Sequence, residues 1–451
     1  MTILKDAVNF AKSITFNDLD VEVIEIAKRA LIDYVGVTLA GCKTPVSSNI
    51  QRYAKRHSAK PQACIFGTEK KVSWDLAALS NGVAGHALDF DDTSWTTIGH
   101  PTVTVAPAVF SAGEMMNISG RQALKAYTVG VEIQNKMAAM VMPEASLNGW
   151  HTTSVFGPFG AATASALIIG LKSEQFLSAL GIAASMASGI RSNFGTMTKA
   201  YHAGMASFNG ATSVILAGLG IGAAENAMEA QDGFIQVFSG KKSNPIPLNF
   251  GSPWDIVKPG LVLKQYPCCS GTHPATDCIL DILKETPFAA EDVESIHVGV
   301  SQLGIKELVC HRPKTPTEAR FSMEYALCSA IVYGKLGLSE FTLEAVNNPQ
   351  IKALLPRIYM EADPELSELG FIGTAPAKLR ITLNDRRILE GSRDLSKGNP
   401  ELPLSDEEFS DKFMECASKV LNLNHCRKVL KALFELEKVK DINLITRLLR
   451  T

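Results

Sequence analysis

The chain has 451 residues, of which 46% are hydrophobic and 20% are charged, and its formal net charge is −2. A chain of this length and composition exceeds one ordinary hydrophobic core, so two or three globular domains are expected. Lysine and arginine form no basic stripe, which argues against a nucleic-acid-binding or membrane-surface protein.

Helical spacing of apolar residues dominates the first 260 residues. After the cap-like pair Asn17-Asp18, Val23, Ala27 and Leu31 recur on one helical face and predict a helix over residues 17–40. Similar patterns predict helices over 74–90, 102–118, 121–142, 155–171, 174–188 and 200–229. We therefore predict a large all-helical domain.

The pattern changes after residue 265. Residues 293–301 alternate like a half-buried strand, and residues 378–391 resemble a hairpin around Asn384-Asp385. Helical segments are expected around 320–336, 340–347 and 349–356. Residues 405–450 are helical again and have no sheet of their own to cover. The prediction is a mostly α protein, with residues 1–264 and 396–451 in the helical domain and residues 265–395 in a smaller α+β domain.

Cysteine usage and segment composition indicate the environment of the protein. Nine cysteines at irregular spacing favour reduced thiols, and no secretory or transit signal is recognised, so we expect a cytoplasmic protein. Residues 203–224 carry no charge but are rich in glycine and serine. We expect this segment to pack inside the protein and not in a membrane.

The central segment of the chain is nearly free of charge. From Gln175 to Ala224 there is no Asp or Glu, and the only full cations are Arg191 and Lys199, with His202 close to one helical turn beyond. A buried ammonium without a counter-charge is costly. We expect an anionic ligand to supply that charge, and the alternative is a core ion pair with an Asp from another helix.

Two histidines are similarly isolated. His100 precedes a long uncharged stretch, and His151 is the only ionisable residue between Glu144 and Lys172. A lone histidine is more often a hydrogen-bonded core residue than a catalyst. Because the two cations above show the same isolation, one shared pocket is favoured.

Three carboxylates, Asp89, Asp91 and Asp92, gather at the predicted end of the helix over 74–90. They could bind a divalent metal or anchor loops. A magnesium site of the terpene synthase type needs a second acidic cluster on a facing helix, and we find none in the sequence. We expect local structural or catalytic roles and no metal.

The predicted domain boundary contains Lys264-Gln-Tyr-Pro-Cys-Cys-Ser-Gly-Thr-His273. Clefts between domains often bind small molecules. Cys268, Cys269 and His273 lack the usual spacing of zinc ligands, and no neighbour visibly activates a cysteine nucleophile. The glycine-rich residues 214–224 lie in a helical context, so a dinucleotide-binding turn is disfavoured.

Four motifs together resemble the MmgE/PrpD family. They are His86-Ala-Leu-Asp-Phe-Asp-Asp-Thr with His100-Pro101, Asn193-Phe-Gly-Thr-Met-Thr-Lys199, Lys264-Gln-Tyr-Pro-Cys-Cys, and Ala319-Arg-Phe-Ser-Met-Glu-Tyr325. The resemblance runs nearly end to end. It implies a helical domain built from both chain ends, a smaller lid domain, a homodimer, and cofactor-free chemistry on small di- or tricarboxylic acids.

The resemblance also implies site residues. The catalytic set would be Asp89, Thr93, His100, His151, Lys199 and Lys264. The candidate substrate-binding residues are Arg191, His202, His273 and Tyr325. No metal and no cofactor is expected.

We expect a lyase that binds its carboxylate substrate through cations and uses His100 or His151 as a general acid. The favoured reaction is decarboxylation of cis-aconitate to itaconate. Alternatives are dehydration of 2-methylcitrate or a related hydroxy acid, epimerisation of an iminodisuccinate-like dicarboxylate, and carboxylate binding without catalysis. These reactions use similar residue types, so the sequence does not separate them.

Overall fold

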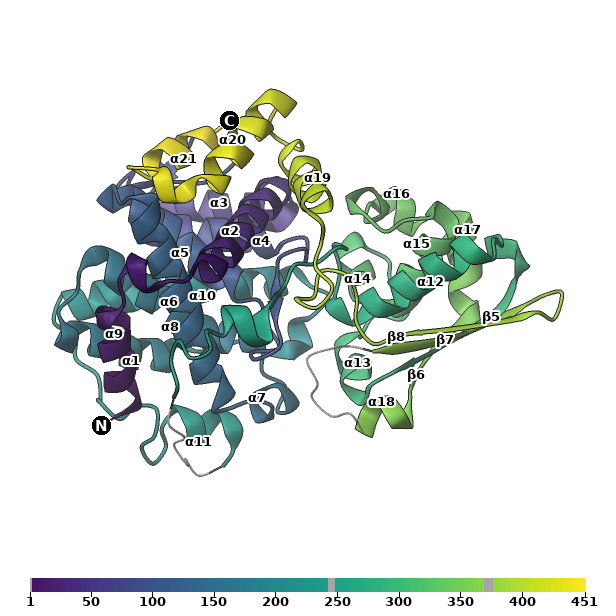
Figure 1. Ribbon diagram of the computed structural model, residues 1–451, viewed down its shortest axis with the longest axis horizontal. Coiled ribbons are helices and arrows are strands. Elements are labelled where there is room, and N and C mark those ends of the chain that lie inside the picture. Colours follow the sequence, from purple (N-terminus) through teal and green to yellow (C-terminus); the bar gives the residue numbers. More distant parts are fainter. Residues whose placement is uncertain (1, 242–247, 369–375) are drawn as a thin grey trace.

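The structure, a computed structural model, describes residues 2–241, 248–368 and 376–451. Two lobes are visible in Figure 1, a large helical one and a smaller one that contains a sheet. The mostly α fold is therefore confirmed. The large hydrophobic core combines residues from both chain ends, whereas a second core is built from residues 266–383. The division at residues 264 and 396 stays a prediction.

The large lobe is built mainly from eleven helices of the N-terminal part and three of the C-terminal part, among the described residues. The former are α1 (Ile3–Ser13), α2 (Val21–Gly41), α3 (Pro45–His57), α4 (Trp74–His86), α5 (Thr102–Met116), α6 (Gly120–Ala139), α7 (Glu144–Leu147), α8 (Thr152–Ile169), α9 (Ser173–Met186), α10 (Met197–Gly218) and α11 (Phe234–Ser239). The latter are α19 (Asp406–Ala417), α20 (Leu423–Phe434) and α21 (Asn443–Leu448).

The helix over 200–229 was predicted too long. Helix α10 ends at Gly218, and Gly220 has a φ of 97°, in the left-handed region where glycine is favoured. The following residues form turns until α11 begins. Apolar composition continues past Gly218, which explains why the sequence pattern did not reveal the end.

Helices α4 and α10 approach closely because glycine faces glycine. A Cβ atom on Gly82 would lie 2.8 Å from the Cα atom of Gly204. This close contact places the end of α4 beside the first turn of α10, and so brings His86 and the following aspartates near Lys199. Helix α8 is long and apolar enough to cross a membrane by composition, but 83% of it is buried inside the protein.

Short strand pairs also occur in or beside the large lobe, which was expected to be purely helical. Strands β1 (Ala63–Cys64) and β2 (Lys71–Val72) are antiparallel, as are β3 (Thr93–Ser94) and β4 (Leu261–Val262). Each strand has only two residues, too few for a period-two pattern to be recognised. The pairing of β3 with β4 brings the segment that carries Lys264 beside the aspartate-rich loop.

The small lobe contains a four-stranded sheet in the order β6-β5-β7-β8. Its strands are β5 (Val293–Val300), β6 (Ile358–Ala362), β7 (Ala377–Leu383) and β8 (Ile388–Arg393). Its helices are α12 (His273–Glu285), α13 (Gln302–Glu307), α14 (Pro316–Ala319), α15 (Met323–Tyr333), α16 (Leu343–Val346), α17 (Pro349–Leu354) and α18 (Pro364–Glu368). Strand β6 was not predicted, and it runs parallel to β5 at the sheet edge with Ile358 as its only fully buried residue.

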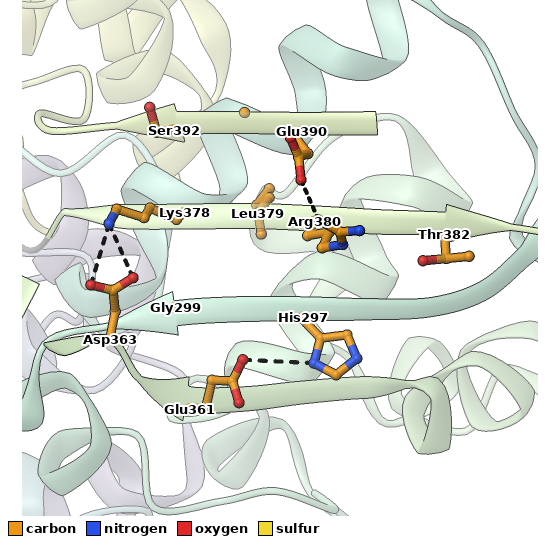
Figure 2. A pocket seen from close by; sticks show the side chains of 11 residues that line it. His297, Gly299, Glu361, Asp363, Lys378, Leu379, Arg380, Thr382, Glu390 and Ser392 are labelled. Carbon is orange, nitrogen blue, oxygen red and sulfur yellow. Dashed lines mark hydrogen bonds and ion pairs between the residues drawn. The ribbon is translucent and has the colours of Figure 1, made fainter. Parts of the chain in front are cut away.

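Helices α12 and α15 contact one side of this sheet, and the opposite face has a hollow of about 760 Å³. Figure 2 shows that the charged groups on this face lie next to one another. Lys378 is 3.1 Å from Asp363, Arg380 is 2.7 Å from Glu390, and His297 is 3.7 Å from Glu361. Because its charges are mutually paired, this larger hollow is a weaker candidate for anion binding than the cavity described next.

Candidate active site

A small buried cavity between the two lobes contains all six residues expected to be catalytic. It has a volume of about 50 Å³, and its ionisable or hydrogen-bonding lining includes Asp89, Thr93, His100, His151, Lys199 and Lys264. These residues come from the loop after α4, strand β3, the approach to α5, the start of α8, the first turn of α10 and the segment after β4. Residues far apart in sequence therefore converge on one space.

Asp89 is the centre of this arrangement. Its φ of 52° is left-handed, a conformation that aspartate tolerates better than most residues but that still costs free energy. This turn directs one carboxylate oxygen to the ammonium of Lys199 and the other to Lys264 Nζ at 3.0 Å. Lys264 also donates to the Asp89 carbonyl oxygen at 2.8 Å.

The expectation that only a ligand neutralises Lys199 is wrong, since Asp89 supplies a carboxylate from elsewhere in the chain. One carboxylate, however, is shared by two buried ammonium groups. Burial would raise the pKa of Asp89, but Lys199 and Lys264 hold it well below its ordinary value. Burial alone would lower the pKa of Lys264, but the Asp89 carboxylate raises it by more, so the pKa lies above its ordinary value. These three residues together carry an excess positive charge.

The Asp89 loop is held from several directions. Arg320 Nε donates to the Leu88 carbonyl oxygen at 2.9 Å, and Lys412 Nζ donates to the Phe90 carbonyl oxygen at 3.0 Å. Arg320 belongs to the small lobe, whereas Lys412 lies on α19 near the C-terminus. Contacts from both lobes therefore fix the loop that aims Asp89.

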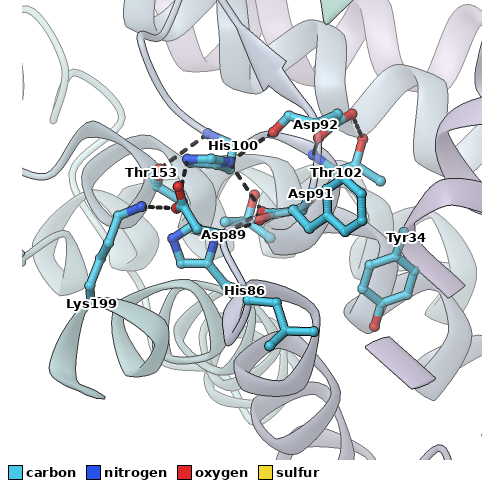
Figure 3. Close-up of polar contacts among 12 residues, drawn as sticks. Tyr34, His86, Asp89, Asp91, Asp92, His100, Thr102, Thr153 and Lys199 are labelled. Carbon is cyan, nitrogen blue, oxygen red and sulfur yellow. Dashed lines mark hydrogen bonds and ion pairs between the residues drawn. The ribbon is translucent and has the colours of Figure 1, made fainter. Parts of the chain in front are cut away.

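His100 faces the cavity through its Nε2 atom. Its Nδ1 atom donates to the Asp92 carbonyl oxygen at 2.8 Å and lies 3.2 Å from the Asp91 carboxylate. Its Nε2 atom is 3.9 Å from Asp89 Oδ1. Figure 3 shows His100 above Asp89, with Lys199 approaching the same carboxylate from the side. The Nδ1 contacts orient the ring and leave Nε2 for a proton transfer in the cavity.

His151 is the N-cap residue of α8 and contacts a second histidine. Its Nδ1 atom lies 3.0 Å from Nδ1 of His202, so one of the two rings donates to the other. Burial first, and then the nearby Lys199, hold the pKa of His151 well below its ordinary value. Burial also lowers the pKa of His202 to about 4. Both rings are therefore neutral at neutral pH. His202 contacts the His151 ring from outside the cavity and so orients it.

Asp91 and Asp92 have separate structural partners. Both Asp91 carboxylate oxygens lie 2.9 Å from His86 Nδ1, and Asp92 accepts from the Thr102 hydroxyl. Burial raises the pKa of Asp92 to about 8, so this carboxyl group is protonated at neutral pH. The loop-anchor interpretation of these two aspartates therefore fits their geometry.

One group of residues has the composition of a metal site. Possible ligand atoms of His86, Asp89 and His100 lie within 4.8 Å of one another. Both oxygens of Asp89 already contact an ammonium group, so a divalent cation there would lie next to two positive charges. The residues present do not fit a metal ion.

None of the four expected substrate-binding residues lines the cavity, and His202 reaches it only through its contact with His151. Arg191 contacts Ser146 Oγ at 3.3 Å, and His273 Nε2 contacts the Cys268 carbonyl oxygen at 3.2 Å. Tyr325 lies in the core of the small lobe and donates to the Glu340 carbonyl oxygen. In this structure Arg191, His202, His273 and Tyr325 are therefore not placed for direct substrate contact.

The cysteines and histidine after Lys264 do not form a zinc site either. Cys268 Sγ contacts Thr272, and burial raises the pKa of Cys268 and of Cys269 to about 12. Both thiols are therefore protonated and poorly nucleophilic. All nine cysteines are free, as predicted.

The cavity also contains residues that sequence reasoning missed. Glu307, at the end of α13, lines it together with Phe321 and Ser270, and the Ser270 hydroxyl has no hydrogen-bond partner among the described residues. Burial raises the pKa of Glu307, although Arg191 and Lys199 oppose this increase. No local pattern marks Glu307, because its neighbours belong to an ordinary short amphipathic helix.

Comparison with known proteins agrees with this site. Residues 5–246 match the MmgE/PrpD N-terminal domain, and residues 266–436 match the MmgE/PrpD C-terminal domain. The chain belongs to the MmgE/PrpD family.

Similar MmgE/PrpD proteins include cis-aconitate decarboxylases from animals and a fungus. The Mus musculus protein is 28% identical over 446 residues, covering 96% of this chain and 90% of its own. The Homo sapiens protein is 27% identical, covering 95% of this chain and 90% of its own, and the Aspergillus terreus protein is 25% identical, covering 99% and 96%. These relatives support a lyase-type function for this family member.

Proposed function

We propose that this protein decarboxylates cis-aconitate to itaconate. The observation that carries the proposal is the pair of buried ammonium groups, Lys199 and Lys264, that share the single carboxylate of Asp89 in a cavity with two histidines. A small polycarboxylate supplies the negative charge that this arrangement lacks. The similarity to cis-aconitate decarboxylases supports the choice of substrate.

The reaction requires charge stabilisation and one proton transfer. The bond between the departing carboxylate and its methylene carbon breaks, CO₂ leaves, and the electron pair spreads over the adjacent carbon–carbon double bond and carboxylate. Lys199 and Lys264 stabilise this developing negative charge. A proton delivered to the far carbon of the allylic system then gives itaconate.

His100 is the better placed of the two histidines to deliver that proton. Its Nε2 atom faces the cavity, and the Asp91 carboxylate, 3.2 Å from Nδ1, interacts favourably with the imidazolium form. His151 has a neutral histidine as its partner and no carboxylate among the described contacts. We assign proton donation to His100 and substrate orientation to His151.

Thr93 supplies a further contact to the substrate. Its hydroxyl is buried, has no hydrogen-bond partner in the described chain, and belongs to a residue that lines the cavity. Buried polar groups are rarely left unpaired. We therefore assign the Thr93 hydroxyl to a substrate carboxylate.

Substrate entry requires the two lobes to separate. A volume of about 50 Å³ holds only a few water molecules, less than a tricarboxylate occupies. The cavity is walled by His151 and Lys199 of the large lobe and by Glu307 and Phe321 of the small lobe. A hinge movement between the lobes would enlarge it, which is the lid function implied by the family resemblance.

The proposal is tested by incubating the purified protein with cis-aconitate, 2-methylcitrate and iminodisuccinate and following the products by NMR. Formation of itaconate and CO₂ from cis-aconitate is expected. Loss of water from 2-methylcitrate or inversion of iminodisuccinate, without itaconate, would overturn decarboxylation. Ligand binding with no turnover of any of the three acids would overturn catalysis.

We also propose a homodimer, as the resemblance to the MmgE/PrpD family implies. Light scattering coupled to size-exclusion chromatography tests this directly. Twice the 48.5 kDa chain mass is expected, whereas the single-chain mass at micromolar concentration would contradict it.

A further inference from the structure

A second cavity lies next to the active cavity and has a different character. It has a volume of about 400 Å³ and is lined by residues of both lobes, including Val46, Lys199, Thr317, Arg320 and Phe341. It shares Asp89, Lys199 and Phe321 with the active cavity, so these side chains form a common wall. The proposed reaction assigns no role to this space.

The most unusual residue of the second cavity is Arg320. Its side chain is buried, with a relative exposure of 6%, and burial lowers its pKa to about 10, so it remains charged at neutral pH. Nε and Nη1 donate to the carbonyl oxygens of Leu88 and Pro316, whereas Nη2 has no hydrogen bond to the described residues. No carboxylate of the described residues forms an ion pair with Arg320. A buried guanidinium of this kind calls for an anion.

Asp89 favours the charged form of Arg320 through space, but none of the charged groups that line the cavity forms an ion pair with it among the described residues. Asp89 is the one carboxylate among the described residues that line the cavity, and Lys199 and Lys264 already occupy it. His86 also lines the cavity, and burial lowers its pKa to about 4, so it is neutral. The net charge of the lining is positive.

Two long helices add to this positive potential. Thr196 and Met197 at the start of α10, and Thr44 and Pro45 at the start of α3, line the same cavity. Helix N-termini carry partial positive charge and unpaired N–H groups. These termini reinforce the site but do not define it, because the buried Arg320 is the full charge that favours an anion there.

Part of the remaining wall is apolar. Val46, Phe321 and Phe341 face the cavity, and the Arg320 guanidinium lies 5.1 Å from the centre of the Phe341 ring. A hydrated inorganic ion would leave these apolar side chains without contacts. An organic carboxylate with a short apolar chain could contact both Arg320 and the apolar side chains.

We propose that this interdomain cavity is a second anion site, which binds a small carboxylate with an apolar chain through Arg320. Its anion-binding group, Arg320, does not line the catalytic cavity, and the site does not depend on the reaction proposed above.

The test uses 4,4,4-trifluorobutanoate as a probe and ¹⁹F NMR as the readout on the full-length protein. Thr317 lines the cavity but has no place in the catalytic site. Thr317→Glu brings a carboxylate toward Arg320, and Thr317→Gln is the uncharged control of the same size. We expect the wild type and Thr317→Gln to bind the probe, and Thr317→Glu to bind it at least tenfold more weakly while it retains wild-type turnover of cis-aconitate.

Several results would overturn the site. The first is failure of the wild type to bind the probe at millimolar concentration, and the second is binding of the probe by Thr317→Glu as tightly as by the wild type. The third result is an equal loss of probe affinity in Thr317→Glu and Thr317→Gln. Complete displacement by tricarballylate, a saturated tricarboxylate for the catalytic cavity, would place the probe there. Displacement by inorganic phosphate as readily as by butanoate would exclude an apolar contribution.

A second pair of variants completes the test. If Thr317→Glu does not fold, Val46→Glu and Val46→Gln replace the pair, with the same expected results. Failure of the proposed decarboxylation would be recognised separately, as wild-type protein that binds the probe normally but forms no itaconate.

Discussion

Replacing Asp89 with asparagine tests the charge balance of the site most selectively. Asparagine has nearly the same shape and tolerates the left-handed φ of 52°, so the backbone should not change. The substitution removes the counter-charge from Lys199 and Lys264, which are both buried. Lys199 and Lys264 then lose the carboxylate with which both form an ion pair in the described part of the chain.

The expected effect on stability is large. Removal of one partner of a buried ion pair costs about 3–5 kcal/mol. A domain of this size loses roughly 2 °C in Tm per kcal/mol, so the Tm should fall by roughly 6–10 °C. Tricarballylate brings the missing negative charge, and it should therefore raise the Tm of Asp89→Asn by more than it raises that of the wild type.

Differential scanning calorimetry with and without tricarballylate measures both effects. Asp232→Asn is a matched control, because Asp232 has a φ of 60° but lies exposed and outside the site. The reasoning is refuted if Asp89→Asn and Asp232→Asn have the same Tm. It is refuted equally if the ligand stabilises Asp89→Asn no more than the wild type.

Three further predictions concern a hydroxyl, a histidine and metal ions. Thr93→Val should lower kcat/KM about tenfold or more with little change in Tm, because it removes a hydrogen bond to a charged group. Thr93→Ser keeps the hydroxyl and should retain activity. Wild-type kinetics in Thr93→Val would exclude the contact. His202 has a folded-state pKa of about 4, below its unfolded value near 6.5. The unfolded chain therefore takes up a proton first, and the free energy of unfolding of the wild type decreases as the pH falls below 6.5. His202→Gln should therefore gain about 2 kcal/mol relative to the wild type in urea unfolding between pH 7.5 and pH 5, and an unchanged difference would contradict the pKa shift. EDTA treatment should leave turnover unchanged, and loss of activity restored by a divalent metal would show that the group around His86 and Asp89 binds one.

The sequence revealed the helical lobe because its helices are long and strongly patterned. Helix α5, for example, begins at Thr102 and ends at Met116, close to the expected 102–118. The spacing of apolar residues did not predict elements in which few side chains are buried. The edge strand β6 has one fully buried residue, and its parallel pairing with β5 depends on contacts between distant segments.

The site residues could be anticipated because isolated charges in apolar sequence must meet a partner or a ligand. His100, His151 and Lys199 are isolated in this way, and the structure places them around one cavity. It did not find that Asp89 serves two lysines, since the pairing depends on the left-handed turn and on the approach of β4 to β3.

Residues outside the uncharged segments were harder to find. Glu307 follows Lys306 in a short amphipathic helix, so nothing local distinguishes it from a surface carboxylate. Arg320 was visible within a family motif, but its burial between the lobes and its lack of a carboxylate partner among the described residues become apparent only from the fold.

The central claim is that buried ammonium groups stabilise the charge released by decarboxylation. The most direct measurement compares kcat for cis-aconitate in the wild type, in Lys199→Met and in the exposed control Lys172→Met. The account predicts a decrease of about 10²–10³ in kcat for Lys199→Met and wild-type turnover for Lys172→Met. A decrease of less than about tenfold in folded Lys199→Met would contradict the account, because that is well below the effect of removing one such stabilising charge.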